Sequence, residues 1–363
     1  MARVFGLCVA AGLFAACGGD EAAYDGPRVP LKVMTRNLYL GADITDVVLS
    51  PSVEQVPARA AAFWAEVVRS DFPARAKLLA DEIMATSPDV IGLQEVEIFR
   101  QQVPSDFAAA PGVNATVVAY DFLALLLEEV AARGQPYNVV LENTLSDVEL
   151  PTALPDGGLM DLRMTDRDVM LAKPGVVTAP LAKAAFTNFL AVNVGGAAGP
   201  RVEVKRGYAT ANVTMPSAVG AATFIWGNAH LEVGGPLKAF QEPQADELVR
   251  LMKPISGPMI FTGDFNSPAT GLGTRSYGFL RRIFADSYQQ LNLAEPGFSC
   301  CMDIYAPGLA GVDERIDLVL TRDDITATAA TVVGGIERTA SGISASDHRG
   351  VVLTLGLVPD AAR

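Results

Sequence analysis

The sequence has few of the side chains that build zinc, redox and nucleic-acid sites. Its 363 residues include only two histidines, four cysteines and two tryptophans. The formal net charge is −13, from 28 Lys and Arg against 41 Asp and Glu. This balance opposes broad, sequence-independent attraction to nucleic acid, although a local basic patch stays open. After the N-terminus, no uncharged apolar run approaches the ~20 residues that a membrane-spanning helix needs.

The cysteines do not have the spacing of a zinc site. Cys8 and Cys17 fall in the N-terminal apolar segment, and Cys300 and Cys301 are adjacent. Zinc ligands are normally separated by two or more residues. In an exported protein the adjacent pair forms either a vicinal disulfide or two buried thiols.

The N-terminus has the pattern of an export signal. Arg3 precedes a short apolar segment that ends in Leu13-Phe-Ala-Ala-Cys17-Gly-Gly. This ending resembles the lipobox of bacterial lipoproteins, in which the cysteine carries the lipid. Phe14 replaces the usual leucine of that motif, so simple signal cleavage is the alternative. We expect an exported protein, either a cell-envelope lipoprotein anchored to the membrane through Cys17 or a secreted protein.

The chain is expected to have three parts. Residues 1–17 form the signal or lipoprotein peptide, residues 18–30 a flexible tether, and residues 31–357 the folded part. In that part, strand-like and helix-like segments alternate without a fixed repeat or an internal linker, so one α/β domain is the simplest interpretation.

Hydrophobic periodicity places the elements of this domain. Strands are expected near residues 31–37, 89–95, 137–142, 168–173, 258–264, 315–321, 327–333 and 350–357. Helices are expected at 58–70, 73–86, 118–133 and 237–252. Antiparallel hairpins are expected within 186–230. Residues 38–72 are interpreted as a long insertion and residues 144–165 as a long loop that contains proline and glycine.

The two histidines, His230 and His348, each stand beside an acidic residue at one end of an apolar run. Loops carried on rigid strands often hold catalytic groups, and imidazole titrates nearest to neutral pH. Taken alone, either histidine is better explained as a structural residue. Other side chains must therefore decide.

Further polar residues fall where predicted strands begin or end. They are Asn37, Glu95, Asp264, Asn266, Asp317 and Asp347. Each one alone is explained as well by a local cap or ion pair, but the whole set favours a common pocket. Hard oxygen ligands of this kind suit Mg²⁺, or Mn²⁺ or Ca²⁺, better than zinc. Such a pocket fits phosphoester hydrolysis by in-line attack of an activated water.

Four motifs in this order resemble the endonuclease/exonuclease/phosphatase superfamily, which includes deoxyribonuclease I, apurinic endonucleases, neutral sphingomyelinases and inositol-polyphosphate 5-phosphatases. The motifs are Leu93-Gln-Glu95, Gly263-Asp-Phe-Asn266, Arg315-Ile-Asp317 and Ser346-Asp-His348. The resemblance covers about residues 31–357. It implies a four-layered α/β sandwich, with two mixed β-sheets packed face to face and helices outside.

The resemblance also implies the metal and water chemistry. Glu95 would bind the metal directly, and Asn37 and Asp347 would lie close to the metal or its waters. Asp264 would orient or deprotonate the attacking water, and Asn266 would hold a phosphate oxygen.

The same resemblance implies distinct roles for the histidines. Asp317 would hydrogen-bond His348, which would stabilise the phosphorane. His230 resembles the second histidine of the deoxyribonuclease I and sphingomyelinase branches and would protonate the leaving oxygen. Asp166 or Asp168 would orient His230, and Arg167 would contact phosphate, with a surface turn of mixed charge as the alternative.

The expected function is that of an exported metal-dependent phosphoric ester hydrolase, most simply a monomeric phosphodiesterase. Its substrate would be a lipid headgroup, a small phosphodiester or nucleic acid, and a phosphomonoester stays open. The alternative enzyme is a secreted nuclease resembling deoxyribonuclease I. The alternative from another class is a catalytically silent surface lipoprotein that acts as a binding module.

Overall fold

The computed structural model describes residues 24–291 and 293–363. The signal peptide, Cys17 and the first part of the expected tether lie outside the described residues. The first strand, β1 (Val29–Asn37), begins two residues before the expected start of the domain, so Val29 and Pro30 belong to the sheet and not to a tether. Among the described residues, no helix has the length and hydropathy needed to cross a bilayer.

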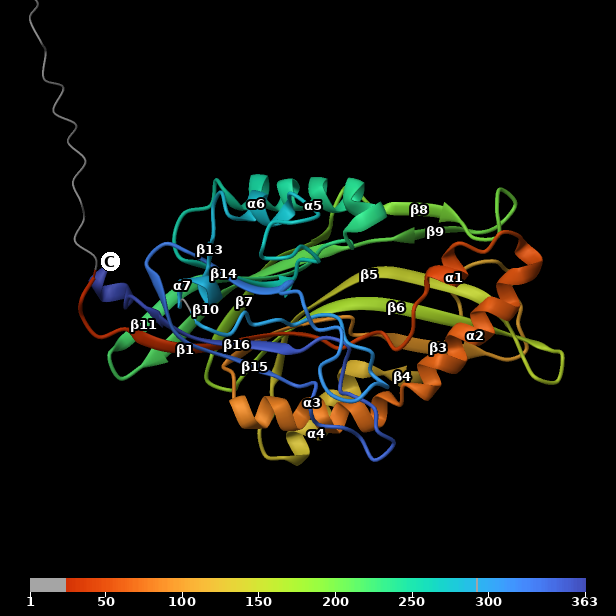
Figure 1. Cartoon of the computed structure of the whole chain (residues 1–363), viewed down its shortest axis with the longest axis horizontal. Coiled ribbons are helices and arrows are strands. Elements are labelled where there is room, and N and C mark those ends of the chain that lie inside the picture. The colour runs from red at the N-terminus through yellow and green to blue at the C-terminus, as the bar shows by residue number, and fades with distance from the viewer. Residues whose placement is uncertain (1–23, 292) are drawn as a thin grey trace, which may run out of the picture.

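Two β-sheets form the centre of the molecule (Figure 1). Sheet A has the order β15-β16-β1-β2-β6-β3-β4, with β5 paired to β6, and sheet B has the order β13-β14-β12-β11-β10-β7. The other strands of sheet A are β2 (Val90–Gln94), β3 (Ile98–Gln102), β4 (Val117–Asp121), β5 (Asn138–Ala153), β6 (Leu159–Ala172), β15 (Ile325–Val333) and β16 (Gly350–Leu357). Those of sheet B are β7 (Val177–Ala185), β10 (Gly207–Ser217), β11 (Gly220–His230), β12 (Met259–Asp264), β13 (Ala285–Asp286) and β14 (Asp317–Arg322). A separate ribbon is formed by β8 (Leu190–Asn193) and β9 (Arg201–Val204).

Helices cover the outer face of each sheet (Figure 1). The long ones are α2 (Val56–Arg69), α3 (Phe72–Thr86) and α4 (Phe122–Ala132) on sheet A, and α5 (Lys238–Met252) on sheet B. The short ones are α1 (Thr45–Val48), α6 (Ser276–Leu280) and α7 (Ser287–Gln290), with 3-10 turns at Val53–Gln55, Gly235–Leu237 and Asp360–Ala362. The helices predicted from periodicity, 58–70, 73–86 and 237–252, are therefore confirmed to within two residues.

Three hydrophobic cores lie between these layers. On β1, Leu31 and Val33 pack into the core between the sheets, whereas Met34 packs into the core beneath the helices of sheet A. This follows from the alternation of side chains along a strand. A third core joins α5 and α6 to sheet B. The four-layered α/β sandwich implied by the resemblance is confirmed.

The long loop predicted for residues 144–165 is wrong. The segment lies mostly within β5 and β6, which form a hairpin turning at residues 154–158. Pro151 suggested a loop, but among the described residues β5 pairs only with β6, so its missing N–H interrupts no second ladder. The insertion at residues 38–72 is likewise ordered and contains α1 and α2.

The helix predicted at 118–133 begins later than expected. Its first residues form β4, and α4 starts at Phe122. The Asp121 carboxylate accepts hydrogen bonds from the N–H groups of Leu123 and Ala124, which caps the helix at that point.

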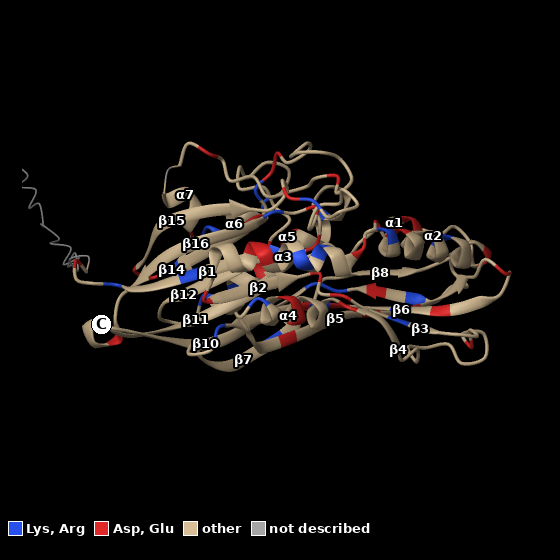
Figure 2. Cartoon of the chain, turned by 90° about the horizontal axis from the view of Figure 1, so that it is seen from below, with Lys and Arg blue, Asp and Glu red and all other residues tan. Residues whose placement is uncertain are grey.

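Figure 2 shows acidic and basic residues interspersed along the elements.

Candidate active site

Strand register brings three polar residues of sheet B side by side. His230 pairs with Asp264 across the parallel strands β11 and β12, and Asp264 pairs with Asp317 across β12 and β14. Because β14 runs antiparallel to β12, the first residue of β14 lies next to the last residues of β11 and β12, at the same end of the sheet. Residues that are up to 87 residues apart in the sequence thus lie side by side at one end of sheet B.

Sheet A contributes the facing half of the site. Asn37 ends β1 opposite Gln94 on the parallel strand β2, and Glu95 follows at once. Glu95 has a φ of 54°, and Asn266 in the facing loop has a φ of 48°. Non-glycine residues in this left-handed region are uncommon and cluster at functional sites, where surrounding contacts hold them.

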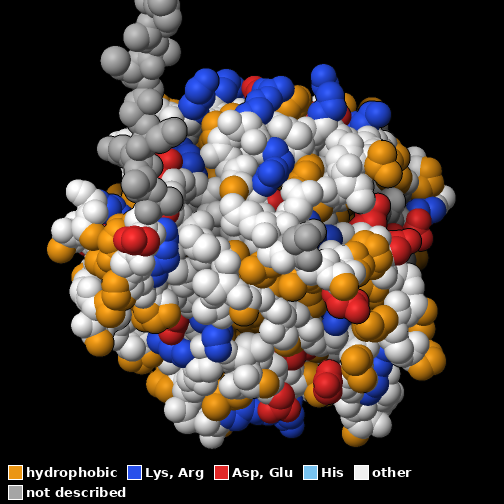
Figure 3. Space-filling model, turned by 60° about the vertical axis from the view of Figure 1, so that its left-hand side comes forward, with side chains coloured by type: hydrophobic (Ala, Val, Ile, Leu, Met, Phe, Trp, Pro, Cys, Tyr) orange, Lys and Arg blue, Asp and Glu red, His pale blue; other side chains and the backbone are white. Residues whose placement is uncertain are grey.

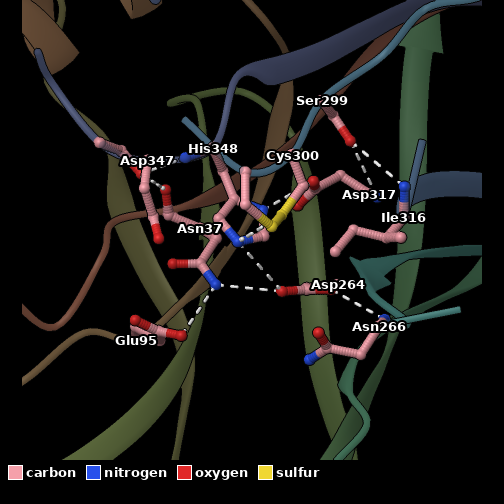
Figure 4. The surroundings of a disulfide bond; sticks show 12 residues. Asn37, Glu95, Asp264, Asn266, Ser299, Cys300, Ile316, Asp317, Asp347 and His348 are labelled. Atoms are coloured by element: carbon pink, nitrogen blue, oxygen red, sulfur yellow. Dashed lines mark hydrogen bonds and ion pairs between the residues drawn. A yellow bond between two sulfur atoms is a disulfide. The ribbon is translucent and has the colours of Figure 1, made fainter. Parts of the chain in front are cut away.

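Asn37 connects the two sheets (Figure 4). Its Nδ2 donates to Glu95 Oε1 at 3.1 Å and to Asp264 Oδ2 at 3.1 Å. The other Glu95 oxygen accepts from the Leu40 backbone N–H at 2.7 Å. Asn37 therefore joins an expected metal ligand to the residue expected to act on water.

His348 has the partner that the resemblance implied. Its Nδ1 lies 2.9 Å from Asp317 Oδ2, and its Nε2 lies 3.7 Å from Asp264 Oδ2 (Figure 4). Burial disfavours the imidazolium, but the charges of Asp317, Asp264 and Asp347 prevail and raise the pKa of His348 well above its usual value. His348 is thus a cation placed against the carboxylates of the site.

The carboxylates of the site are themselves perturbed. Burial, assisted by the charge of Asp317, raises the pKa of Asp264 to about 7. Burial also raises the pKa of Asp347 to about 6, and the nearby charge of Glu95 adds to that effect. Both groups titrate close to neutrality, as expected for groups that exchange protons or bind cations.

The second histidine has the opposite electrostatic environment. His230 is fully buried, and burial together with the charges of Arg206 and His348 lowers its pKa well below the usual value. Its Nδ1 lies 3.1 Å from Arg206 Nη1 and 3.7 Å from Asp168 Oδ1. Its Nε2 lies 3.6 Å from Asp264 Oδ2.

Arg206 was missed by sequence reasoning. It immediately precedes β10, whose first residue Gly207 pairs with His230. Asp166 Oδ2 lies 3.5 Å from its Nη1, and Glu232 Oε1 lies 4.0 Å from its Nε. Its position at a strand end, like that of the other site residues, was the available signal. Glu97 and Glu232, two further buried acids of this cluster, were missed as well.

The expected phosphate contact of Arg167 is contradicted. Arg167 donates to Asp121 at 2.7 Å, to Glu142 at 2.9 Å and to the Val96 carbonyl at 2.9 Å. Successive side chains of a strand point to opposite faces, so Asp166 and Asp168 face His230 whereas Arg167 points away from it. Its hydrogen bonds connect β6 to β4 through Asp121 and to β5 through Glu142.

Replacing Arg167 with methionine is expected to leave turnover within about 3-fold of the unchanged protein, because the side chain does not reach the site. The loss of its charged hydrogen bonds is expected to lower the free energy of unfolding by about 1–3 kcal/mol. Urea denaturation and turnover measured on the same preparation check both statements. A large loss of turnover at unchanged stability would contradict this assignment.

The adjacent cysteines lie against His348. The structure joins Cys300 and Cys301 in a disulfide, and Cys300 Sγ lies 3.6 Å from His348 Nε2 (Figure 4). Cys300 is buried, whereas Cys301 is exposed. Of the two alternatives open from the sequence, the structure has the disulfide.

The donor set at this site fits a hard divalent cation. Glu95, Asn37 and Asp347 offer carboxylate and amide oxygens, and none of the three offers the sulfur or nitrogen that zinc prefers. Burial and Glu95 together disfavour ionised Asp347, and a cation would relieve that cost. These three residues would hold the ion.

The sequence profile of the Endonuclease/Exonuclease/phosphatase family matches residues 68–348, which is most of the chain. The chain belongs to this family. It is accordingly a phosphoester hydrolase. A search of curated protein sequences finds no match.

Solved structures of the family share the fold. An endonuclease/exonuclease/phosphatase from Beutenbergia cavernae is 22% identical, with a TM-score of 0.50, 91% of this chain and 72% of that chain covered. A family protein from Leptotrichia buccalis is 14% identical, with a TM-score of 0.52 and coverages of 90% and 99%. D. rerio TDP2, solved with a single-strand DNA product, is 15% identical, with a TM-score of 0.50 and coverages of 90% and 98%.

Proposed function

We propose that the protein is an exported, divalent-metal-dependent phosphodiesterase that cleaves its substrate by in-line attack of an activated water. The observation that carries this proposal is the position of Asp264. Its Oδ2 lies 3.1 Å from the Asn37 amide and 3.7 Å from His348 Nε2. One carboxylate thus lies between the residues suited to a metal and the imidazolium suited to a charged phosphoryl group.

The side chains divide the reaction between them. Asp264 accepts a proton from the water as it attacks phosphorus, which its pKa of about 7 permits near neutrality. The imidazolium of His348 donates toward the phosphoryl oxygens, on which charge accumulates in the transition state. The Asn266 backbone N–H donates to Asp264 Oδ1, and its side-chain amide lies beside His230. A bound divalent cation would supply charge neutralisation at a phosphate oxygen.

His230 supplies a second polar group for the leaving oxygen of the ester. Its Nε2 faces Asp264 and lies 3.3 Å from Asn266 Nδ2, which places a second imidazole beside the reaction centre. A second donor suits a leaving oxygen that departs as an alkoxide, as it does from a diester and from a monoester alike, so the substrate panel below tests the diester against the monoester.

The surroundings favour a small or lipid phosphoester modestly over nucleic acid. A cavity of about 60 Å³ adjoins Glu95, Asp166 and Arg206 and is otherwise lined mainly by apolar side chains. Those side chains come from α1 and the residues before it, from β5 and β6, and from the β8–β9 ribbon with its turn, and they include Ile44, Val48, Met164, Val194 and Val204. Figure 3 shows hydrophobic side chains scattered over one face, with several basic side chains along its upper edge. A nuclease is the second candidate, because TDP2 with its DNA product shares the fold.

The reaction is tested with bis-(p-nitrophenyl) phosphate and protein that lacks residues 1–17. Turnover is expected with Mg²⁺, Mn²⁺ or Ca²⁺ and is expected to disappear with EDTA. Metal-independent turnover would contradict the mechanism, and no turnover with any of these cations would favour the silent binding module. A panel of plasmid DNA, RNA, sphingomyelin, other phospholipids and phosphomonoesters, at matched metal and salt, then separates the substrate classes.

Export is proposed from the N-terminal pattern alone. In a bacterial host fed labelled palmitate, the full chain is expected to incorporate label, and the Cys17→Ser variant is not. Label retained in Cys17→Ser would contradict lipidation at Cys17, and an unlabelled protein in the medium would indicate simple signal cleavage.

Metal removal is expected to destabilise the protein more as the pH rises. Burial is the largest cause that raises the pKa of Asp166 to about 6, of Asp264 to about 7 and of Asp347 to about 6. The folded state therefore holds these protons more tightly than the unfolded state. In EDTA, the free energy of unfolding should fall as the pH rises from about 4 to about 7.

A cation held by Asp347 and Glu95 favours the ionised form of Asp347, and its charge also favours ionised Asp264 nearby. Saturating Mg²⁺ is therefore expected to raise Tm by several degrees at about pH 8 and by much less at about pH 5. Scanning calorimetry at both pH values, with Mg²⁺ or EDTA, measures the difference. An equal effect of Mg²⁺ at both pH values would contradict binding of the cation at Asp347.

A further inference from the structure

The contact between Arg206 and His230 defines the protonation of the second histidine. Arg206 Nη1 lies 3.1 Å from His230 Nδ1. A guanidinium has only N–H donors and does not lose its proton in proteins, so the imidazole nitrogen it contacts must accept. His230 Nδ1 is therefore unprotonated. We propose that Arg206 is a positioning residue that holds His230 as the neutral tautomer with its proton on Nε2, directed at the reacting phosphoester.

The other groups around His230 are consistent with this assignment. Asp168 on β6 is the competing partner of Nδ1, but its Oδ1 is at 3.7 Å, beyond hydrogen-bond distance, and accepts no hydrogen bond from the described residues. The cationic His348, placed by the loop before β16, disfavours a second imidazolium nearby. Arg206 itself is held by the carboxylates of Asp166 and Glu232, as described above.

The position of the Asn266 amide leaves one direction for the remaining proton of His230. Asn266 Nδ2 donates to the Leu231 carbonyl at 2.9 Å, so the nitrogen, and not the oxygen, of this amide lies beside His230 Nε2 at 3.3 Å. Arg206 and Asn266 thus both offer donors to a ring that has one acceptor nitrogen when neutral, and the charged guanidinium at 3.1 Å is the stronger donor than the neutral amide at 3.3 Å. The Nε2–H then points toward Asp264 Oδ2, which at 3.6 Å lies just beyond hydrogen-bond distance, and toward the space that a substrate oxygen would enter.

This assignment changes the chemistry expected of His230, and this part rests on the proposed function. The sequence predicted that it protonates the leaving oxygen. A neutral imidazole that gave up its Nε2 proton would become an imidazolate, which is far too basic to form near neutral pH. His230 therefore keeps its proton and stabilises the departing alkoxide by a hydrogen bond. The leaving oxygen takes its proton from solvent, and the proton of the attacking water goes to Asp264.

Because the chain has only two histidines, NMR can test the tautomer directly. Protein labelled with ¹⁵N, with and without Mg²⁺, should give two sets of imidazole signals, and His230→Gln identifies one of them. Between about pH 5.5 and 8.5, we expect His230 to show an unprotonated Nδ1 and a protonated Nε2, with His348 protonated on both nitrogens at the lower end. A protonated Nδ1 on His230, or an imidazolium near neutral pH, would overturn the proposal. No substrate is present, so a wrong proposed function leaves this result unaffected.

Variants test whether Arg206 is responsible. Arg206→Met should give His230 a mixture of tautomers and raise the pH at which it titrates, because one of the causes that lower its pKa is removed, and should lower kcat about 10-fold or more with a smaller change in KM. Arg206→Lys should restore most of both properties. Arg163→Met is the matched control, because Arg163 is a similarly buried arginine that pairs with Asp147 outside the site. An unchanged His230 tautomer in folded Arg206→Met would overturn the role of Arg206. The His348 signals report whether the site is still folded, and the wild-type spectrum decides the tautomer if this variant does not fold.

Discussion

Replacing His348 with alanine is expected to lower kcat by more than about 100-fold, the low end for the loss of a preorganised donor at a charged transition state. The reason is its position: Asp317 fixes Nδ1 at 2.9 Å, and Nε2 faces Asp264 at 3.7 Å. No other imidazolium is available, since His230 is held neutral. Turnover of bis-(p-nitrophenyl) phosphate with saturating metal measures the effect.

Asp317→Asn separates the charge of His348 from its presence. Without the carboxylate, the pKa of His348 should fall, so its imidazolium should be lost at a lower pH than in the unchanged protein. The loss of kcat is then expected to be small at acidic pH and to grow as the pH rises. If His348→Ala retained full turnover while remaining folded, the reaction centre would have to lie elsewhere.

The Asp264→Asn variant is expected to lose about 1,000-fold or more in kcat, because it removes the group that accepts the proton of the attacking water. The substitution preserves shape, so Asn37 and His348 remain in place. In the unchanged protein, the ionised fraction of Asp264 grows as the pH rises through its pKa of about 7, and turnover should rise with it in this range. The variant should lose that rising limb, which a pH–rate profile measures.

Asp161→Asn is a matched control for this variant. Asp161 is as buried as Asp264, with exposed fractions of 0% and 1%, but it lies at the opposite end of β6 from the site. It accepts hydrogen bonds from Ser105 and from the Asp106 N–H. Its substitution is expected to change stability and to leave kcat within a few-fold. Equal losses in both variants would mean that Asp264 acts through folding.

The elements were largely predictable wherever local periodicity was strong. Helices α2, α3 and α5 each bury one face, and the spacing of their apolar residues is visible within a few turns. The β5–β6 hairpin was not predictable in this way, because an edge strand tolerates Pro151 and exposed polar positions that resemble those of a loop. The composition of such a strand depends on which neighbours pair with it, and this is decided at long range.

The site residues also fall into two groups, those that a local motif predicts and those that only long-range pairing brings together. The convergence of Glu95, Asp264, Asp317 and His348 was predictable because each lies in a short motif at a strand end, and the order of these motifs is specific; their roles in the reaction stay predictions. Arg167 was assigned to the wrong face, because its one-residue offset from Asp166 and Asp168 reverses the direction of the side chain. Arg206 was missed because its position beside a strand end was the only local signal and no motif surrounds it, and the pairing of Gly207 with His230 is what brings it into contact.

The two histidines show what the sequence determined and what the tertiary structure determined. The sequence by itself determined the chemistry available, since 363 residues with two imidazoles and a set of acids and amides at strand ends limit where a reaction can occur. Only the tertiary structure decided the charge of each imidazole. His348 lies among carboxylates that raise its pKa, whereas His230 contacts a guanidinium and lies in a buried position that lowers its pKa. The physical reason is that a pKa depends on the partners and on the water removed, and both are supplied by residues distant along the chain.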